Sequence, residues 1–233
     1  MRSTAILIPA RIGSTRFPEK PLCNLGGIPM IKRVYNACKG YGLPTYILTD
    51  SQRVSSLFQN TSVIIDNEDY KNGTERCSGA VSKTDYLDKY NYFINVQGDM
   101  PDITPDIIKK VHEKVYHGSI STAFCDIEDP EVMNDPNSVK AVVTGDPDFH
   151  GKIKWFGRGF LYGYHHLGIY GYDRRCLLKY RDLSSRYGYE DYEGLEQLRW
   201  IENDYKILGA KVKFNGIEIN TPKDKDKWNE KMD

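Results

Sequence analysis

Over its first 115 residues the chain alternates short apolar runs with segments of helical periodicity. The apolar runs are nearly continuous, as in strands buried on both faces of a parallel sheet, and they lie at 4–8, 46–48, 62–65 and 92–96. Helices are predicted at 30–38, 52–59, 73–83 and 104–115. Because crossovers between parallel strands are right-handed, this alternation predicts an α/β fold with parallel strands.

The pattern changes at about residue 119, where the strand candidates become shorter and their connections irregular. Further strands are expected at 120–124, 140–143, 153–156, 166–172 and 211–214. Further helices are expected at 194–203 and after Thr221-Pro222. No linker separates the halves, so we expect them to share one sheet. The prediction is a single domain, 1–233, with a core of about 1–118 and 190–233 and a smaller mixed lobe of about 119–189.

Charge and cysteine usage exclude several classes of protein. The 233 residues include 32 Lys+Arg and 32 Asp+Glu, so no overall basic field exists to bind nucleic acid or an anionic membrane. The five cysteines are scattered, with no C-x-x-C pair, as is typical of reduced thiols. No apolar stretch approaches the roughly 18 residues of a membrane span. We expect a cytoplasmic protein with neither nucleic-acid nor membrane partners.

Candidate chemistry lies where the predicted parallel strands end, because open α/β sheets bind ligands beyond those ends. The loop at 9–21 carries two Arg and one Lys among small and hydroxylic residues, and Asp99 follows the strand at 92–96. Such cationic and hydroxyl groups suit phosphate oxygens, and a carboxylate suits a magnesium ion that bridges them. The loop is neither a Walker A loop nor a G-x-G-x-x-G turn. These residues therefore predict a nucleoside triphosphate site of another type.

Five motifs, in order, resemble those of the 3-deoxy-manno-octulosonate cytidylyltransferases, which activate the acidic sugar Kdo. They are I-P-A-R with S-T-R-F-P-E-K-P (8–21), N-G-T-E-R (72–76), N-V-Q-G-D-M-P (95–101), H-L-G-I-Y-G-Y (166–172) and L-E-Q-L-R (195–199). The resemblance spans about residues 5–227. The last two motifs separate this family from the related sialic-acid-activating enzymes.

The resemblance implies a Rossmann-like nucleotidyltransferase fold, with a mostly parallel mixed sheet and a smaller lobe that helps to form a homodimer. The implied reaction joins CTP and Kdo to give CMP-Kdo and pyrophosphate, with Mg²⁺. The implied catalytic residues are Arg11, Lys20 and Asp99. The implied nucleotide contacts are Arg11, Ser14, Arg16, Lys20 and Arg76. The implied sugar contacts are Gln97, Arg158, His166, Tyr170, Glu196 and Gln197.

Two departures from the family pattern affect the implied site. The family has an Asp-Thr-Pro whose Asp is a second metal ligand besides Asp99, whereas this chain has Asn220 at that position. The Asn220 amide oxygen is a weaker magnesium ligand, so we expect weaker metal binding with retained turnover, or compensation by Glu218 or Asp224. The segment 157–165 is also shorter than its family counterpart, so the resemblance does not predict the dimer contacts or part of the sugar pocket.

Other interpretations remain. The substrate could be another acidic sugar, such as an amino-Kdo or a different ulosonic acid, or the chain could bind nucleotide with impaired turnover. A glycosyltransferase is disfavoured, because no Asp-x-Asp pair follows the strand at 92–96. Glu190, Glu193 and Glu196 recur every three residues, which by itself indicates a solvated helix face. We expect the 17 tyrosines to pack in the core or at interfaces.

Overall fold

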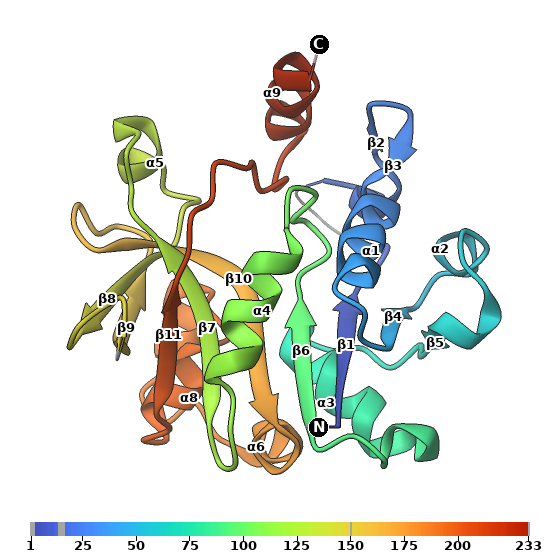
Figure 1. Ribbon diagram of the computed structural model, residues 1–233, viewed down its shortest axis with the longest axis horizontal. Helices are drawn as coiled ribbons and strands as arrows, with labels where there is room; N and C mark the ends of the chain where they lie inside the picture. Colours follow the sequence, from blue (N-terminus) through green and yellow to red (C-terminus); the bar gives the residue numbers. More distant parts are fainter. Residues whose placement is uncertain (1–2, 14–16, 150, 233) are drawn as a thin grey trace.

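The computed structural model describes residues 3–13, 17–149 and 151–232, which fold around one sheet (Figure 1). The sheet has nine strands in the order β5-β4-β1-β6-β10-β7-β11-β9-β8. Their bounds are β1 Thr4–Pro9, β4 Thr45–Thr49, β5 Val63–Ile65, β6 Tyr92–Val96, β7 Ile120–Cys125, β8 Lys140–Thr144, β9 Lys152–Gly157, β10 Tyr164–Asp173 and β11 Ile207–Lys211. A separate small hairpin pairs β2 (Asn24–Leu25) with β3 (Ile28–Pro29).

Helices cover both faces of the sheet (Figure 1). The α-helices are α1 Met30–Gly40, α2 Gln52–Ser55, α3 Gly73–Lys83, α4 Pro105–Lys114, α5 Pro130–Asn134, α6 Arg174–Lys179, α7 Tyr189–Glu193, α8 Leu198–Glu202 and α9 Pro222–Met232. None of the helices in the described part of the chain has the length and apolar character that crossing a bilayer requires.

The continuous apolar run of β1 is explained by two cores, one on each face of the sheet. Side chains alternate between the faces of a strand, so Ile6 and Ile8 join one core while Ala5 and Leu7 join the other. The first core is completed by residues of α1 and α4, and the second by residues of α3, α6 and α8. The expected α/β class is therefore confirmed, with strands buried on both faces.

Strand direction brings distant segments to one edge of the sheet. Strand β1 pairs in parallel with β4 and β6, as the alternating pattern predicts. Strand β10 runs antiparallel to both β6 and β7, with Ile169 opposite Val96. The beginning of β10 therefore lies beside the carboxyl end of β6. This arrangement places the H-L-G-I-Y motif next to the Q-G-D motif.

Both halves of the chain contribute to the one sheet, as the lack of a linker predicts. Strands β7 and β10 come from the expected mixed lobe, yet they lie in the middle of the sheet. Strands β8 and β9 lie at its edge and pair antiparallel with each other. Strand β10 runs antiparallel to β6 and β7, and strand β9 runs antiparallel to β11 and β8. These two strands give the mostly parallel sheet its mixed character.

Three elements differ most from their predicted bounds. The helix expected at 52–59 is only α2, Gln52–Ser55. The helix expected at 194–203 is only α8, Leu198–Glu202, because Gly194 adopts a positive φ of 63° and ends the preceding helix α7. The strand expected at 211–214 is β11, Ile207–Lys211. A Cβ on Gly209 would lie 2.4 Å from the Phe124 ring, so this strand needs a glycine that weakens its apolar pattern.

Candidate active site

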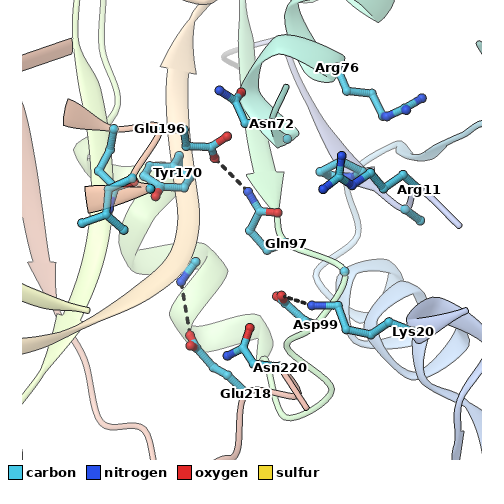
Figure 2. A pocket seen from close by; sticks show the side chains of 18 of the residues that line it. Arg11, Lys20, Asn72, Arg76, Gln97, Asp99, Tyr170, Glu196, Glu218 and Asn220 are labelled. Atoms are coloured by element: carbon cyan, nitrogen blue, oxygen red, sulfur yellow. Dashed lines mark hydrogen bonds and ion pairs between the residues drawn. The ribbon is translucent and has the colours of Figure 1, made fainter. Parts of the chain in front are cut away.

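A cavity of about 350 Å³ lies at the carboxyl edge of the parallel strands. It is walled by the loop after β1, the start of α3, the end of β6, the start of β10, the α7–α8 turn and the segment 218–220 (Figure 2). The candidate residues that line it are Arg11, Lys20, Arg76, Gln97, Asp99, Arg158, His166, Tyr170, Glu196, Gln197 and Asn220. Ser14 and Arg16 lie outside the described residues. The structure thus brings the other candidates together, while their individual roles stay predictions.

The basic loop and the strand-end carboxylate meet, as the sequence predicts. Lys20 Nζ lies 2.7 Å from Asp99 Oδ2, and both side chains are only partly exposed, at 18% and 25% (Figure 2). The ends of β1 and β6 approach closely here, since a Cβ on Gly98 would lie 2.9 Å from the Pro9 carbonyl oxygen. Glycine before Asp99 therefore lets the carboxylate reach the basic loop.

Arg76, on the same side of the cavity as Arg11, is held by carbonyl and carboxylate groups (Figure 2). Its guanidinium donates to the Asp66 carbonyl oxygen at 3.0 Å and lies 3.6 Å from Asp50 Oδ2. Asp50 Oδ1 also accepts the Ile12 N–H at 2.9 Å, so one carboxylate joins Arg76 to the loop after β1. The guanidinium stacks over the Tyr70 ring at 5.1 Å. These contacts fix a cation at the cavity wall with little side-chain freedom.

Glu196 joins two walls of the cavity. Its Oε1 accepts the Gln97 Nε2–H at 3.0 Å, and its Oε2 accepts the Thr74 N–H at 3.0 Å (Figure 2). Loss of surrounding water raises the pKa of Glu196 to about 7. Gln97 is confined by glycines, because a Cβ on Gly73 would lie 2.7 Å from its amide nitrogen and one on Gly168 would lie 3.0 Å from its Cγ.

His166 and Tyr170 form an uncharged wall. Thr122 Oγ1 donates its proton to the Ile169 carbonyl oxygen at 2.7 Å, so it must accept from His166 Nε2 at 2.9 Å. This assigns the Nε2–H tautomer and leaves Nδ1 as an acceptor. Burial lowers the pKa of His166 to about 3 and raises the pKa of Tyr170 well above its ordinary value. Both side chains are therefore neutral at physiological pH.

Arg158 lies at the cavity rim and ties neighbouring loops together. Its Nε donates to the Glu193 carbonyl oxygen at 3.3 Å, and its Nη1 donates to the Asn137 carbonyl oxygen at 2.5 Å. Its own carbonyl accepts from Lys140 Nζ at 3.2 Å. The shorter segment 157–165 thus still presents a fixed guanidinium to the cavity.

The segment that contains Asn220 lies beside Asp99, since the Ile219 N–H donates to the Asp99 carbonyl oxygen at 2.9 Å. Figure 2 shows the Glu218 and Asn220 side chains on the Asp99 side of the cavity. Glu218 Oε1 accepts the Gly168 N–H at 3.5 Å. Burial, followed by repulsion from Asp99, raises the pKa of Glu218 to about 8.

These oxygen donors suit a hard cation, and magnesium commonly binds one or two carboxylates together with substrate phosphate oxygens. Within the described ranges no three His, Cys, Asp or Glu side chains are grouped as a ready metal site. Lys20 already provides a cation against Asp99. The residues present therefore fit magnesium that is completed by a phosphate ligand.

Sequence reasoning missed a buried ionic network behind the cavity. Glu190, expected on a solvated face, is 7% exposed and lies 2.5 Å from Arg199 Nε. Arg199 Nη2 also lies 2.9 Å from Glu75 Oε1. Asn72 accepts the Glu75 N–H at the start of α3 and donates to Glu190 Oε1 at 3.1 Å. The expectation for Glu190 was wrong because α7 packs that side chain against α3, a tertiary contact that helical spacing does not encode.

Comparison with known proteins supports the same family as the motifs. The cytidylyltransferase family model matches residues 5–207. The 8-amino-3,8-dideoxy-manno-octulosonate cytidylyltransferase of Shewanella halifaxensis is 35% identical over 241 residues, with 95% of each chain covered. The 3-deoxy-manno-octulosonate cytidylyltransferase of Bartonella bacilliformis is 35% identical over 212 residues, with 87% of each chain covered.

A solved structure extends the likeness to the fold. A CMP:2-keto-3-deoxy-manno-octonic acid synthetase complexed with CTP matches with a TM-score of 0.85 and 30% identity, over 98% of both chains. The expected Rossmann-like nucleotidyltransferase fold is thus confirmed. From the motifs, the shared cavity and these matches together, the chain belongs to the cytidylyltransferase family and is a relative of the Kdo-activating members that its motifs resemble.

Proposed function

We propose that this chain transfers CMP from CTP to the anomeric hydroxyl of Kdo and releases pyrophosphate. One observation carries the proposal: the cations Arg11 and Lys20 share a single cavity with Glu196 and His166, whose polar atoms suit a sugar. The relative from B. bacilliformis is named for Kdo, and the matched solved structure contains CTP. Together these findings support one reaction at one site.

The basic wall of the cavity suits the triphosphate of CTP. Pyrophosphate leaves with a high negative charge, so phosphoryl transfer depends mainly on positioning and on cations that offset this charge. Lys20 is placed by Asp99, and Arg76 is placed by Asp50 and the Asp66 carbonyl. Arg11 adds a third cation from the loop after β1 (Figure 2). We assign Ser14 and Arg16 to the same triphosphate from the sequence motif alone.

Asp99 and Asn220, which both line the cavity, would provide oxygen ligands for magnesium. Bound magnesium would neutralise phosphate charge and lower the pKa of a coordinated hydroxyl. Asp99 brings a full negative charge to this position, and Asn220 brings a neutral amide oxygen. Lys20, which lies beside Asp99, would offset the negative charge on the leaving pyrophosphate. No side chain of the cavity is assigned as a covalent nucleophile.

The opposite wall suits an acidic sugar. Glu196, Gln97 and the His166 ring offer acceptors and donors for hydroxyl groups. The Gln97–Glu196 bond and the bond between His166 and Thr122 keep these groups in place. Tyr170 and Gln197 line the same wall. Arg158 places a fixed positive charge at the rim, which suits the sugar carboxylate. This division assigns the two substrates to facing walls.

An amino sugar is the second candidate. The S. halifaxensis relative, named for an 8-amino-dideoxy sugar, is as similar in identity as the Kdo-named relative. An ammonium group on the sugar would need a carboxylate partner, and Glu196 and Glu218 both line the cavity. This candidate therefore differs from the first only in the group at the end of the sugar chain.

We also propose a cytoplasmic homodimer. All five cysteines are free, which suits a reducing compartment. The segment after Arg158 carries exposed apolar side chains, with Leu161 70% and Tyr162 60% exposed and the half-buried Phe160 stacked on Tyr162. Tyr187 and Tyr192, on the α7 side, are 69% and 94% exposed. A second copy of the chain would remove such surface from water.

Pyrophosphate release tests the reaction. The purified protein should release pyrophosphate from CTP only when magnesium and a ulosonic acid are both present, and CTP should be preferred over the other nucleoside triphosphates. Parallel assays with Kdo and 8-amino-Kdo would decide between the two sugars. Binding of CTP without release in any assay would favour the impaired nucleotide-binding interpretation and refute the proposal.

A further inference from the structure

The segment between β11 and α9 presents alternate side chains to the cavity. Ile219 is fully buried in a small core with Leu25, Met30 and Trp228. Its neighbours Glu218 and Asn220 both line the cavity instead. This is the alternation of an extended chain, in which residues two apart share a side. The position before Ile219 is therefore as well placed to reach the cavity as the position after it.

Asp224, the other acidic residue near Asn220, is engaged elsewhere. A single oxygen, Oδ2, accepts the Asn220 N–H at 3.0 Å, the Thr221 N–H at 2.7 Å and the Thr221 hydroxyl at 2.9 Å. These bonds place the carboxylate at the N-terminal turn of α9, where it stabilises free backbone donors. Asp224 is also absent from the cavity lining that the described residues form. Its role is to shape the loop.

Glu218 has the opposite surroundings. Among the described residues its carboxyl accepts one long hydrogen bond, from the Gly168 N–H at 3.5 Å, and it interacts electrostatically with Asp99 and Lys20. The Ile219 N–H to Asp99 carbonyl bond ties the backbone of this segment to the end of the loop after β6. Glu218 thus places a second carboxylate on the Asp99 side of the cavity, whereas Asn220 contributes no charge there.

We propose that Glu218 is the second carboxylate of the divalent-cation site and provides the negative charge that Asn220 lacks. The inference rests on the proposed function, because magnesium enters with the nucleotide. Two carboxylates and an amide oxygen match the donor number that magnesium accepts when phosphate oxygens complete its shell. Lys20, which pairs with Asp99 in this structure, would then turn to the triphosphate when the cation binds.

The test measures metal affinity rather than activity. Mn²⁺ would be titrated into the protein with CTP and without sugar, and free Mn²⁺ would be followed by electron paramagnetic resonance, with Mg²⁺ as competitor. Glu218→Gln should weaken Mn²⁺ affinity in the CTP complex about tenfold or more. CTP affinity without metal should be retained, because glutamine keeps the size and shape of the Glu218 side chain.

A matched control and a rescue separate ligation from other effects. Asp226→Asn removes one carboxylate from α9, where its side chain is 64% exposed, and should leave Mn²⁺ affinity unchanged. Adding Asn220→Asp to Glu218→Gln should restore Mn²⁺ affinity, because a carboxylate returns to the same side of the cavity. Thermal unfolding of each variant would verify that the fold is retained.

Three results would overturn the inference: wild-type Mn²⁺ affinity in Glu218→Gln, an equal loss of metal-free CTP binding, or failure of Asn220→Asp to rescue. The proposed function fails separately. If the wild-type chain released no pyrophosphate from CTP with any ulosonic acid, both would fall. If it released pyrophosphate while Glu218→Gln bound Mn²⁺ normally, this inference alone would be wrong.

Discussion

Replacement of Arg199 by Met should strongly destabilise the fold, because its guanidinium neutralises two carboxylates that are nearly out of water. Arg199 donates to Glu190 Oε2 and Oε1 at 2.5 and 2.7 Å and to Glu75 Oε1 at 2.9 Å. The side chains of Glu190 and Glu75 are only 9% and 14% exposed. Met keeps much of the volume of Arg but leaves both carboxylates without this cation, with only uncharged donors such as Asn72 Nδ2 and the Lys71 N–H.

The expected loss follows from this burial. Removing one partner of a buried ion pair typically costs about 3–5 kcal/mol, since the remaining charge stays desolvated. In a chain of this size each kcal/mol lowers Tm by about 2–4 °C, so Arg199→Met should melt about 6–20 °C lower. Urea unfolding followed by circular dichroism measures the free energy directly. Adding Glu190→Gln should recover part of the loss, because one unpaired charge disappears.

An exposed ion pair provides the control. Lys179 and Asp182 are 65% and 71% exposed, so Lys179→Met should change the free energy of unfolding by less than about 1 kcal/mol. If Arg199→Met cost no more than this control, the buried network would not be stabilising the junction of α3, α7 and α8, and the reasoning would be refuted.

Three further predictions concern the cavity. Lys20→Met should lower kcat for pyrophosphate release by about 10²–10³-fold, through loss of a cation at the leaving group, and an unchanged kcat would contradict its assignment. Glu196 has a folded pKa of about 7, above the ordinary 4.5, so its contribution to stability is present below pH 4.5 and is lost as pH rises through 7. Glu196→Gln should therefore flatten the fall in unfolding free energy between pH 5 and 8, by about 3 kcal/mol at most, and urea titrations at both pH values would measure it. Gly73→Ala should raise KM for the sugar, because the added methyl group would displace the Gln97 amide at 2.7 Å, whereas Gly159→Ala has open space and should not.

The parallel half of the fold could be predicted from residues near in sequence. Continuous apolar runs such as 4–8 require burial on two faces, and the two cores provide it. The place of β10 could not be predicted, because its antiparallel pairing with β6 depends on a partner about 70 residues away. The boundary of β11 was missed because Gly209 interrupts its apolar pattern. This glycine leaves room for the ring of Phe124 on the neighbouring strand β7, a contact that the local sequence does not encode.

The candidate site follows the same division. The contact between Lys20 and Asp99 could be expected, since both positions follow parallel strands that end at one edge. The sequence could not show which of the two acidic residues faces the cavity. In the structure Asp224 binds the first turn of α9, whereas Glu218 lines the cavity. Both residues are acidic and lie near Asn220, and only the buried Ile219 between Glu218 and Asn220 determines which side chains face the cavity.

The central claim is that one cavity brings CTP and an acidic sugar together for direct CMP transfer. Phosphorus nuclear magnetic resonance of the protein with CTP, magnesium and Kdo tests it most directly. The account predicts that the three CTP resonances give way to one phosphodiester resonance and free pyrophosphate, with no change when the sugar is omitted. Persistence of CTP with the sugar present, or its hydrolysis to CMP without it, would contradict the account.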